Sequence, residues 1–169
     1  AGKHGRVIAR PDGQFAFENN PDIARRFYGV NVCFSAQYLA HEEADRLADR
    51  LARIGYNALR IHHYEGELTS NQASSTTLNP EKVEQLDYLF AAMKKRGIYV
   101  TTDLFVSRPV KNSDIGVDKP GNVEMDTFKI MIPVVPKAFE NWKEFSRALL
   151  THVNPHTKMS YAEDPTLGW

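Results

Sequence analysis

The sequence has little of several features that mark special classes of protein. Cys33 is the single cysteine among 169 residues, so no disulfide can form within the chain. Basic and acidic residues balance at 21 each, and zero net charge argues against a nucleic-acid partner. No apolar run approaches the roughly 20 residues that span a bilayer, so no membrane partner is expected. Ten glycines and nine prolines are too few for a disordered or fibrous chain.

What is present is an ordinary globular composition, with 42% apolar and 25% charged residues. Residues 1–26 predict an N-terminal β-hairpin element. Pro11-Asp12-Gly13 separates two short runs that alternate apolar and polar residues, which is a hairpin signal, and residues 19–22 predict a second turn.

Beyond residue 26, predicted strands and helices alternate. Gly55 and Asn79 are typical of a helix C-terminal cap and N-terminal cap. The patterns predict strands at 27–34, 58–63, 98–106 and 166–169, helices at 41–54, 80–96 and 137–153, and loops at 65–78 and 107–135. The third helix would bury one face made of Phe139, Trp142, Phe145, Leu149 and Val153. Such alternation implies a parallel sheet with right-handed crossovers.

Two α/β architectures fit this order: an open doubly wound sheet and a barrel. The first strand-to-helix turn, residues 33–38, has no glycine-rich phosphate loop, which counts against nucleotide binding. No cofactor is predicted. A complete (β/α)8 TIM barrel needs about 250 residues. We therefore expect residues 27–169 to form the N-terminal half of a TIM barrel, about strands 1 to 4, preceded by the hairpin.

Functional groups gather at the carboxyl ends of parallel strands in either architecture. The candidates at these ends are Asn31, Arg60, His62, His63, Tyr64 and Asp103. Side-chain alternation puts Arg60, His62 and Tyr64 on one inward face, with Leu59 and Ile61 facing the helices. Arg60 and His62 would either bind a polyol or carboxylate ligand, or only satisfy core partners, and spacing alone leaves both readings open. Asp103 would orient Arg60 or be catalytic, and we favour orientation.

No metal site is predicted. His62 and His63 are adjacent on a strand and point opposite ways, and no His-x-His or Cys-x-x-Cys spacing occurs. His41 is expected at the surface, and His152 and His156 are expected to be solvated or capping groups. Cys33 is expected to be a small buried residue.

Several blocks of the sequence resemble glycoside hydrolase family 5 and its relatives in clan A, of cellulase or mannanase type. The blocks are residues 26–31, 54–64, 86–100, 149–157 and 161–165, and together they cover nearly the whole chain in the family's order. The resemblance implies a retaining hydrolase that cleaves a β-linked polysaccharide such as glucan or mannan with two glutamates about 5 Å apart. Arg60 matches the family's strand-two arginine, which supports the nucleophile.

The resemblance further implies that His62 and His63 bind sugar hydroxyls, and from their place near the strand ends we also predict Asn31, Tyr64 and Asp103 as substrate-binding residues. Many members end strand three with Asp-x-His, whereas this chain has Asp103-Leu104-Phe105, so His62 or His63 would take the place of that histidine. Both catalytic glutamates would lie outside these residues, the first just beyond Trp169. We therefore expect an inactive fragment, completed by the other half of the barrel. A secreted or periplasmic location is also implied.

Two rival functions remain at this point. The first is a non-catalytic half-barrel that binds carbohydrate through His62, Tyr64 and aromatic loop residues without cleaving it. The second is a TIM-barrel enzyme of another class, such as an isomerase or aldolase, which would bind phosphate late in the barrel. A lysine on a strand interior would support the second rival, and none occurs in the predicted strands.

Overall fold

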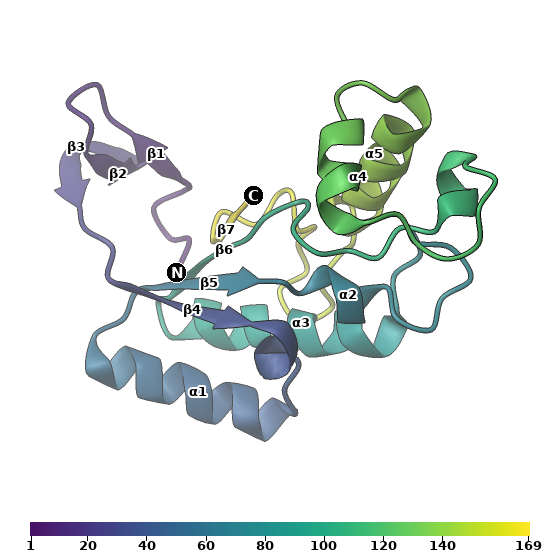
Figure 1. Ribbon diagram of the computed structural model, residues 1–169. Helices are drawn as coiled ribbons and strands as arrows, with labels where there is room; N and C mark the ends of the chain where they lie inside the picture. Colours follow the sequence, from purple (N-terminus) through teal and green to yellow (C-terminus); the bar gives the residue numbers. More distant parts are fainter.

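The computed structural model describes residues 1–169 and contains two separate sheets (Figure 1). The first is antiparallel and consists of β1 (Val7–Ala9), β2 (Phe15–Phe17) and β3 (Asn20–Arg25). The second is parallel, in the order β4 (Gly29–Cys33), β5 (Ala58–His62), β6 (Tyr99–Thr101) and β7 (Leu167–Gly168). Strands adjacent in the chain are thus adjacent in space, as in part of a barrel, which confirms the predicted fold class.

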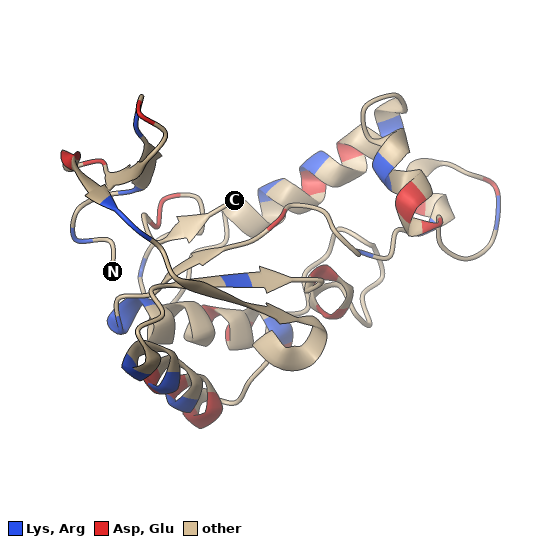
Figure 2. Cartoon of the chain, turned by 60° about the vertical axis from the view of Figure 1, so that its left-hand side comes forward, with Lys and Arg blue, Asp and Glu red and all other residues tan.

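The helices are α1 (His41–Ile54), α2 (Glu65–Leu68), α3 (Pro80–Lys95), α4 (Met125–Met131) and α5 (Pro136–Leu150), with short 3-10 turns η1 (Phe34–Gln37) and η2 (Asn112–Ile115). None of them combines the length and the apolarity needed to cross a membrane. Figure 2 shows that charged residues concentrate on the helices and loops, whereas the strands carry few. The sheet is therefore mainly a core element.

The N-terminal hairpin forms as predicted, but it gains a third strand. β1 pairs with β2 around the Asp12-Gly13 turn. The predicted second turn at 19–22 is wrong, because the chain turns at Glu18 and Asn19 and then runs as β3 beside β2. β3 is an edge strand, where Pro21 is tolerated because an outward-facing proline removes no ladder hydrogen bond.

The parallel sheet buries one face against α1 and α3, which lie below it in Figure 1. Leu59, Ile61 and Val100 point to these helices and are at most 3% exposed. β4 and β5 approach closely at Gly29, where an added Cβ would lie 3.2 Å from both the carbonyl oxygen and the Cβ of Ala58. A side chain at Gly29 would push the two strands apart.

Both predicted helix caps are confirmed. Gly55 follows α1 with a φ of 97°, the left-handed conformation in which glycine carries no Cβ penalty. The Asn79 side chain accepts hydrogen bonds from the backbone amides of Glu81 and Lys82, and Pro80 is the first residue of α3. Both caps could be predicted from the sequence because a helix cap depends on only three or four neighbouring residues.

Other boundaries differ from the predictions. The predicted loops contain short helices: α2 lies in 65–78, and η2 and α4 lie in 107–135. β6 is only three residues long, so Asp103 follows the strand instead of lying in it. α5 ends at Leu150, and Phe139 and Val153 are exposed, whereas Phe145 and Leu149 are buried.

Candidate functional site

The strand register aligns polar side chains on the face of the sheet that points away from α1 and α3. Asn31 on β4 lies opposite Arg60 on β5, and Arg60 lies opposite Thr101 on β6. Two pairs further along the ladder, Cys33 lies opposite His62. Partners in a parallel ladder share a face, so these side chains form a row near the carboxyl ends of the strands.

Asp103 joins two members of this row. The Arg60 guanidinium donates to Oδ2 of Asp103 at 2.7 Å, and Nδ1 of His62 lies 2.9 Å from the same oxygen. Partial burial acts to raise the pKa of Asp103, but hydrogen bonds from His62 and Arg60 outweigh it, and the pKa lies below its usual value of 3.8. Asp103 is therefore an ionised anchor for both side chains at neutral pH.

Tyr64 does not lie on the open face with Arg60 and His62, so that part of the prediction is wrong. His63 has a φ of 51°, which breaks the strand alternation at the end of β5. Tyr64 consequently turns into the core, where it is 1% exposed, and its hydroxyl donates to the backbone carbonyl of Asp103 at 2.7 Å. Tyr64 supports Asp103 from behind and is not accessible to a ligand.

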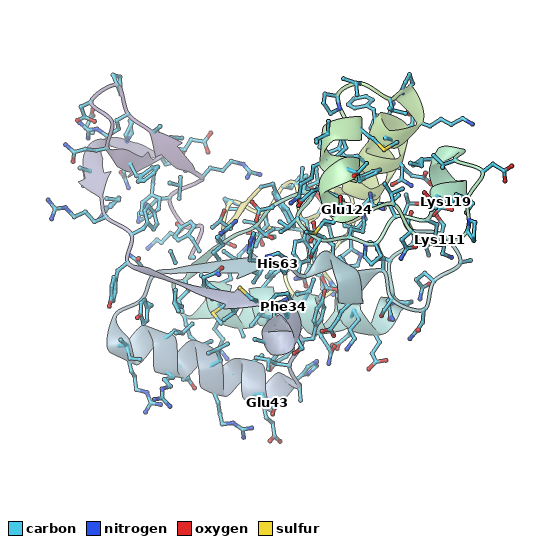
Figure 3. All side chains as sticks on the ribbon, viewed as in Figure 1. Phe34, Glu43, His63, Lys111, Lys119 and Glu124 are labelled. Atoms are coloured by element: carbon cyan, nitrogen blue, oxygen red, sulfur yellow. The ribbon has the colours of Figure 1, made fainter.

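Phe34 and His63 form a feature that the sequence did not signal. Both have left-handed backbones, with φ of 57° and 51°, which is uncommon for bulky residues. They follow neighbouring strands, and their rings stack at 4.9 Å between centroids and 16° between planes (Figure 3). Phe34 is 63% exposed. Because strained backbone of this kind clusters at functional sites, we include the pair in the candidate site.

Asn31 and His63 complete the set of predicted site residues. Asn31 is exposed, and its side-chain amide donates to Sγ of Cys33 at 3.0 Å. Cys33 is half-buried on the polar face, so the expectation of a buried core residue is wrong. The imidazole of His63 meets that of His62 edge-on, with centroids 4.2 Å apart. Desolvation lowers the pKa of His63, with His62 as a second cause, which favours the neutral ring.

The loop after β6 is held by a buried carboxylate that the sequence analysis placed in a polar loop. Glu65 is fully buried and accepts hydrogen bonds from the backbone amides of Val106 at 2.5 Å and Ser107 at 3.2 Å. Burial raises the pKa of Glu65, partly offset by these amides. The neighbouring Arg108 is 1% exposed, donates to Ser75 and Asn141, and has its pKa lowered by burial to about 10. These contacts fix the segment that carries Asp103.

A cavity of about 510 Å³ lies between the N-terminal sheet and the parallel sheet. Its walls include Phe15, Phe27, Tyr99 and Trp169, but none of Arg60, His62 or Asp103. The ring of Tyr99 stacks on Phe17 and meets Phe27 edge-on. The cavity has a mainly apolar lining, and it adjoins the polar row at Thr101, which lines it and lies opposite Arg60.

Similarity to known proteins is found in the three-dimensional structure and not in the sequence. No family model and no curated protein matches the sequence. A glycoside hydrolase family 5 mannosidase from Rhizomucor miehei superposes with a TM-score of 0.71 at 17% identity, over 99% of this chain and 48% of that one. The fold is that of half a family 5 barrel.

Two further structures agree with this assignment. The endo-1,4-β-mannanase from R. miehei gives a TM-score of 0.68 at 14% identity, over 98% of this chain and 46% of that one. The endo-β-1,4-mannanase from Thermotoga petrophila gives 0.58 at 22% identity, over 84% and 33%. The chain thus spans about half the length or less of the structures it matches, and over that length it shares their fold.

Proposed function

We propose that the chain is the first half of a barrel glycoside hydrolase that cleaves a β-linked polysaccharide, glucan or mannan, with retention of configuration. The observation that carries the proposal is the Arg60–Asp103–His62 cluster at the carboxyl ends of the strands in a half-barrel of family 5 fold. In barrel enzymes this end of the sheet is where catalytic residues lie. The names of the superposed structures, mannanases and a mannosidase, favour mannan.

Arg60 would act by positioning the nucleophile. A guanidinium has five N–H donors in a planar fork, and the contact with Asp103 engages Nη2. The Arg60 side chain is 43% exposed, so its other donors face the open side of the sheet and can bind a second carboxylate. Asp103 keeps the fork in one orientation, which is the role that the sequence analysis favoured for it.

Asn31, His62 and His63 would bind sugar hydroxyls. Asn31 offers a carbonyl oxygen and an amide, and neutral imidazoles offer one donor and one acceptor each. Asn31 lies within β4, His62 and His63 lie at the end of β5, and the exposed ring of Phe34 stacks on His63. An apolar ring face next to several polar groups suits a sugar, which has both apolar and hydroxyl-bearing surfaces.

We further propose that the acid/base and nucleophile come from outside residues 1–169, so that these residues alone are inactive. Two carboxylates lie beside the site, and both are engaged. Asp103 accepts from Arg60 and His62, and Glu65 is buried beneath two backbone amides. Retaining hydrolysis needs two carboxyl groups about 5 Å apart with access to the substrate. The partner would be the other half of the barrel, in the same polypeptide or a second chain.

A non-catalytic carbohydrate-binding half-barrel is the second candidate. The observation that favours it is the stacked pair Phe34 and His63, whose exposed aromatic face would bind a sugar ring without any acid or nucleophile. The two candidates differ in whether bonds are broken, so an assay of product release separates them.

The experiment measures reducing ends released from β-mannan and β-glucan by the full polypeptide that carries these residues. Hydrolase function predicts product release that falls at least a hundredfold in Arg60→Ala. Arg50→Ala is the matched control, because Arg50 is an exposed arginine on α1. Binding of mannan without product release would support the second candidate, and equal activity of the two variants would overturn the role of Arg60.

A further inference from the structure

A second cluster of reactive side chains lies on the helical side of the sheet, away from the polar row. His41 is the first residue of α1, Glu84 lies on α3, and His156 lies in the segment after α5. One ligand atom from each residue lies within 4.8 Å of the other two. Nε2 of His41 is 2.6 Å and Nε2 of His156 is 3.6 Å from Oε1 of Glu84. Three distant parts of the chain thus converge on one point.

Tyr88 orients both imidazoles. The ring of His41 stacks on that of Tyr88 with centroids 3.6 Å apart and planes at 5°, and His156 meets the same ring edge-on at 5.2 Å and 89°. The Tyr88 hydroxyl donates to Oδ2 of Asp45 at 2.8 Å, which ties the ring to α1. Each imidazole therefore presents its Nε2 toward Glu84, which lies one helical turn before Tyr88.

The segment that carries His156 is also fixed. Asn154 is 1% exposed, and its amide donates to the backbone carbonyl of Asp87 on α3 at 2.9 Å. Its carbonyl oxygen accepts from the backbone amides of His156 at 2.8 Å and Thr157 at 3.2 Å. His152 adds a 2.8 Å contact with the buried Asp87, so it is a partly buried partner of α3 instead of the solvated or capping group that we expected. Little ordering of this segment is needed to bring His156 to Glu84.

We propose that His41, Glu84 and His156 bind a zinc ion. Two imidazoles and one carboxylate are ligands that zinc takes readily, at about 2.0–2.2 Å. A tetrahedral site with those bond lengths separates its ligand atoms by about 3.3 Å. The distances of 2.6 and 3.6 Å bracket this value, and all three side chains are exposed and can adjust. Water would complete the coordination.

The proposed ion is structural and lies apart from the polysaccharide site. It would join α1, α3 and the segment after α5, three elements that pack outside the sheet, whereas Arg60 and His62 point from the other face. Zinc binding requires each imidazole to offer the lone pair of its Nε2 to the metal. The hydrogen bond between Nε2 of His41 and Oε1 of Glu84 must therefore give up its proton when zinc binds.

The test is calorimetric titration of the full polypeptide with zinc chloride, together with thermal unfolding with and without zinc. We expect one ion per chain, a rise in Tm with zinc, and reversal by a chelator. The double variant His41→Ala/His156→Ala should bind zinc at least about tenfold more weakly and lose the rise in Tm. Glu84→Gln should also weaken zinc binding. Because it changes only one exposed side chain on α3, it tests the proposal even if the double variant folds poorly.

His4→Ala and Glu81→Gln are the matched controls. His4 lies in the N-terminal element and Glu81 in the first turn of α3, and neither belongs to the cluster of His41, Glu84 and His156. Both controls should bind zinc as the unchanged protein does. Zinc binding retained within about twofold in both the double variant and Glu84→Gln would overturn the proposal, as would the absence of saturable binding. In that case the pair His41 and Glu84 is an ordinary surface contact.

Discussion

Arg60 and Asp103 are joined at 2.7 Å across 43 residues of sequence, and this contact fixes the geometry of the candidate site. The arginine comes from within a strand and the aspartate from just beyond the next strand. The aspartate is also held by His62 and, through its backbone, by Tyr64. Changes at Asp103 should therefore affect the orientation of Arg60 more than the stability of the fold.

Asp103→Asn is expected to lower catalytic turnover of the full polypeptide by about 10- to 100-fold, because a neutral amide holds Arg60 less firmly. KM should change much less than kcat, since the amide still fills the same space. Steady-state kinetics on β-mannan checks this split. An unchanged kcat would show that Asp103 does not position Arg60.

The same carboxylate predicts a pH dependence of stability. The pKa of Asp103 is lower in the folded chain than its usual 3.8, so its stabilising effect is present at neutral pH and is lost as the pH falls below about 4. The difference in urea unfolding between the unchanged protein and Asp103→Asn should thus be present at pH 7 and shrink as the pH falls below about 4. A difference that stays constant over this range would contradict the assignment.

Phe34→Ala is expected to weaken oligosaccharide binding about fivefold, or ~1 kcal/mol, with little effect on stability. The ring is 63% exposed and stacks on His63, so its removal opens no cavity. Phe34→Trp should retain binding. Titration with manno-oligosaccharides measures both, and Ile130→Ala, at a 72% exposed residue of α4, is the control. Equal affinity in Phe34→Ala and Ile130→Ala would remove Phe34 from the site.

Glu65→Ala is expected to destabilise the chain by about 2–3 kcal/mol, because the backbone amides of Val106 and Ser107 lose their buried acceptor. Glu65→Gln should cost less, since the amide oxygen can still accept one of these bonds. Chemical denaturation gives both values. Hydrogen exchange at Val106 and Ser107 should accelerate in Glu65→Ala, and unchanged exchange there would contradict this role.

Asn79→Ala should lower the free energy of unfolding by about 1 kcal/mol through loss of the α3 cap. Asn79→Asp retains the acceptor and should be nearly neutral. Urea denaturation of the three proteins provides the comparison. A loss as large in Asn79→Asp as in Asn79→Ala would show that the amide group, which donates to Ser70, matters more than the cap.

The parts of the fold that could be predicted depend on local signals. α1 and the start of α3 follow from periodicity and from the caps at Gly55 and Asn79. β3 was missed because Asn20–Arg25 has a polar, proline-containing sequence, and only pairing with β2 makes it a strand. α4 was missed because it is short, and its cap, Glu124, is not among the usual capping residues.

The candidate site, like the fold, has features that the sequence predicts and features that depend on contacts between distant residues. The row of Asn31, Arg60 and His62 could be anticipated from strand alternation, which holds as long as the strand is regular. The burial of Tyr64 could not, because it depends on the left-handed backbone of His63, for which histidine gives no reliable signal. Contacts between residues far apart in sequence, such as His41 with His156, are set by packing alone.

The strand order β4-β5-β6-β7, identical in chain and in space, also has a consequence for how the protein assembles. Each strand pairs with the one made just before it, so a nascent chain can add each βα unit to an existing edge as soon as it emerges. Pairing each strand with its neighbour in the sequence keeps every loop that must close as short as a parallel connection allows, which limits the loop-closure entropy of each step. The half-barrel would then serve as the template on which the next parallel strand forms.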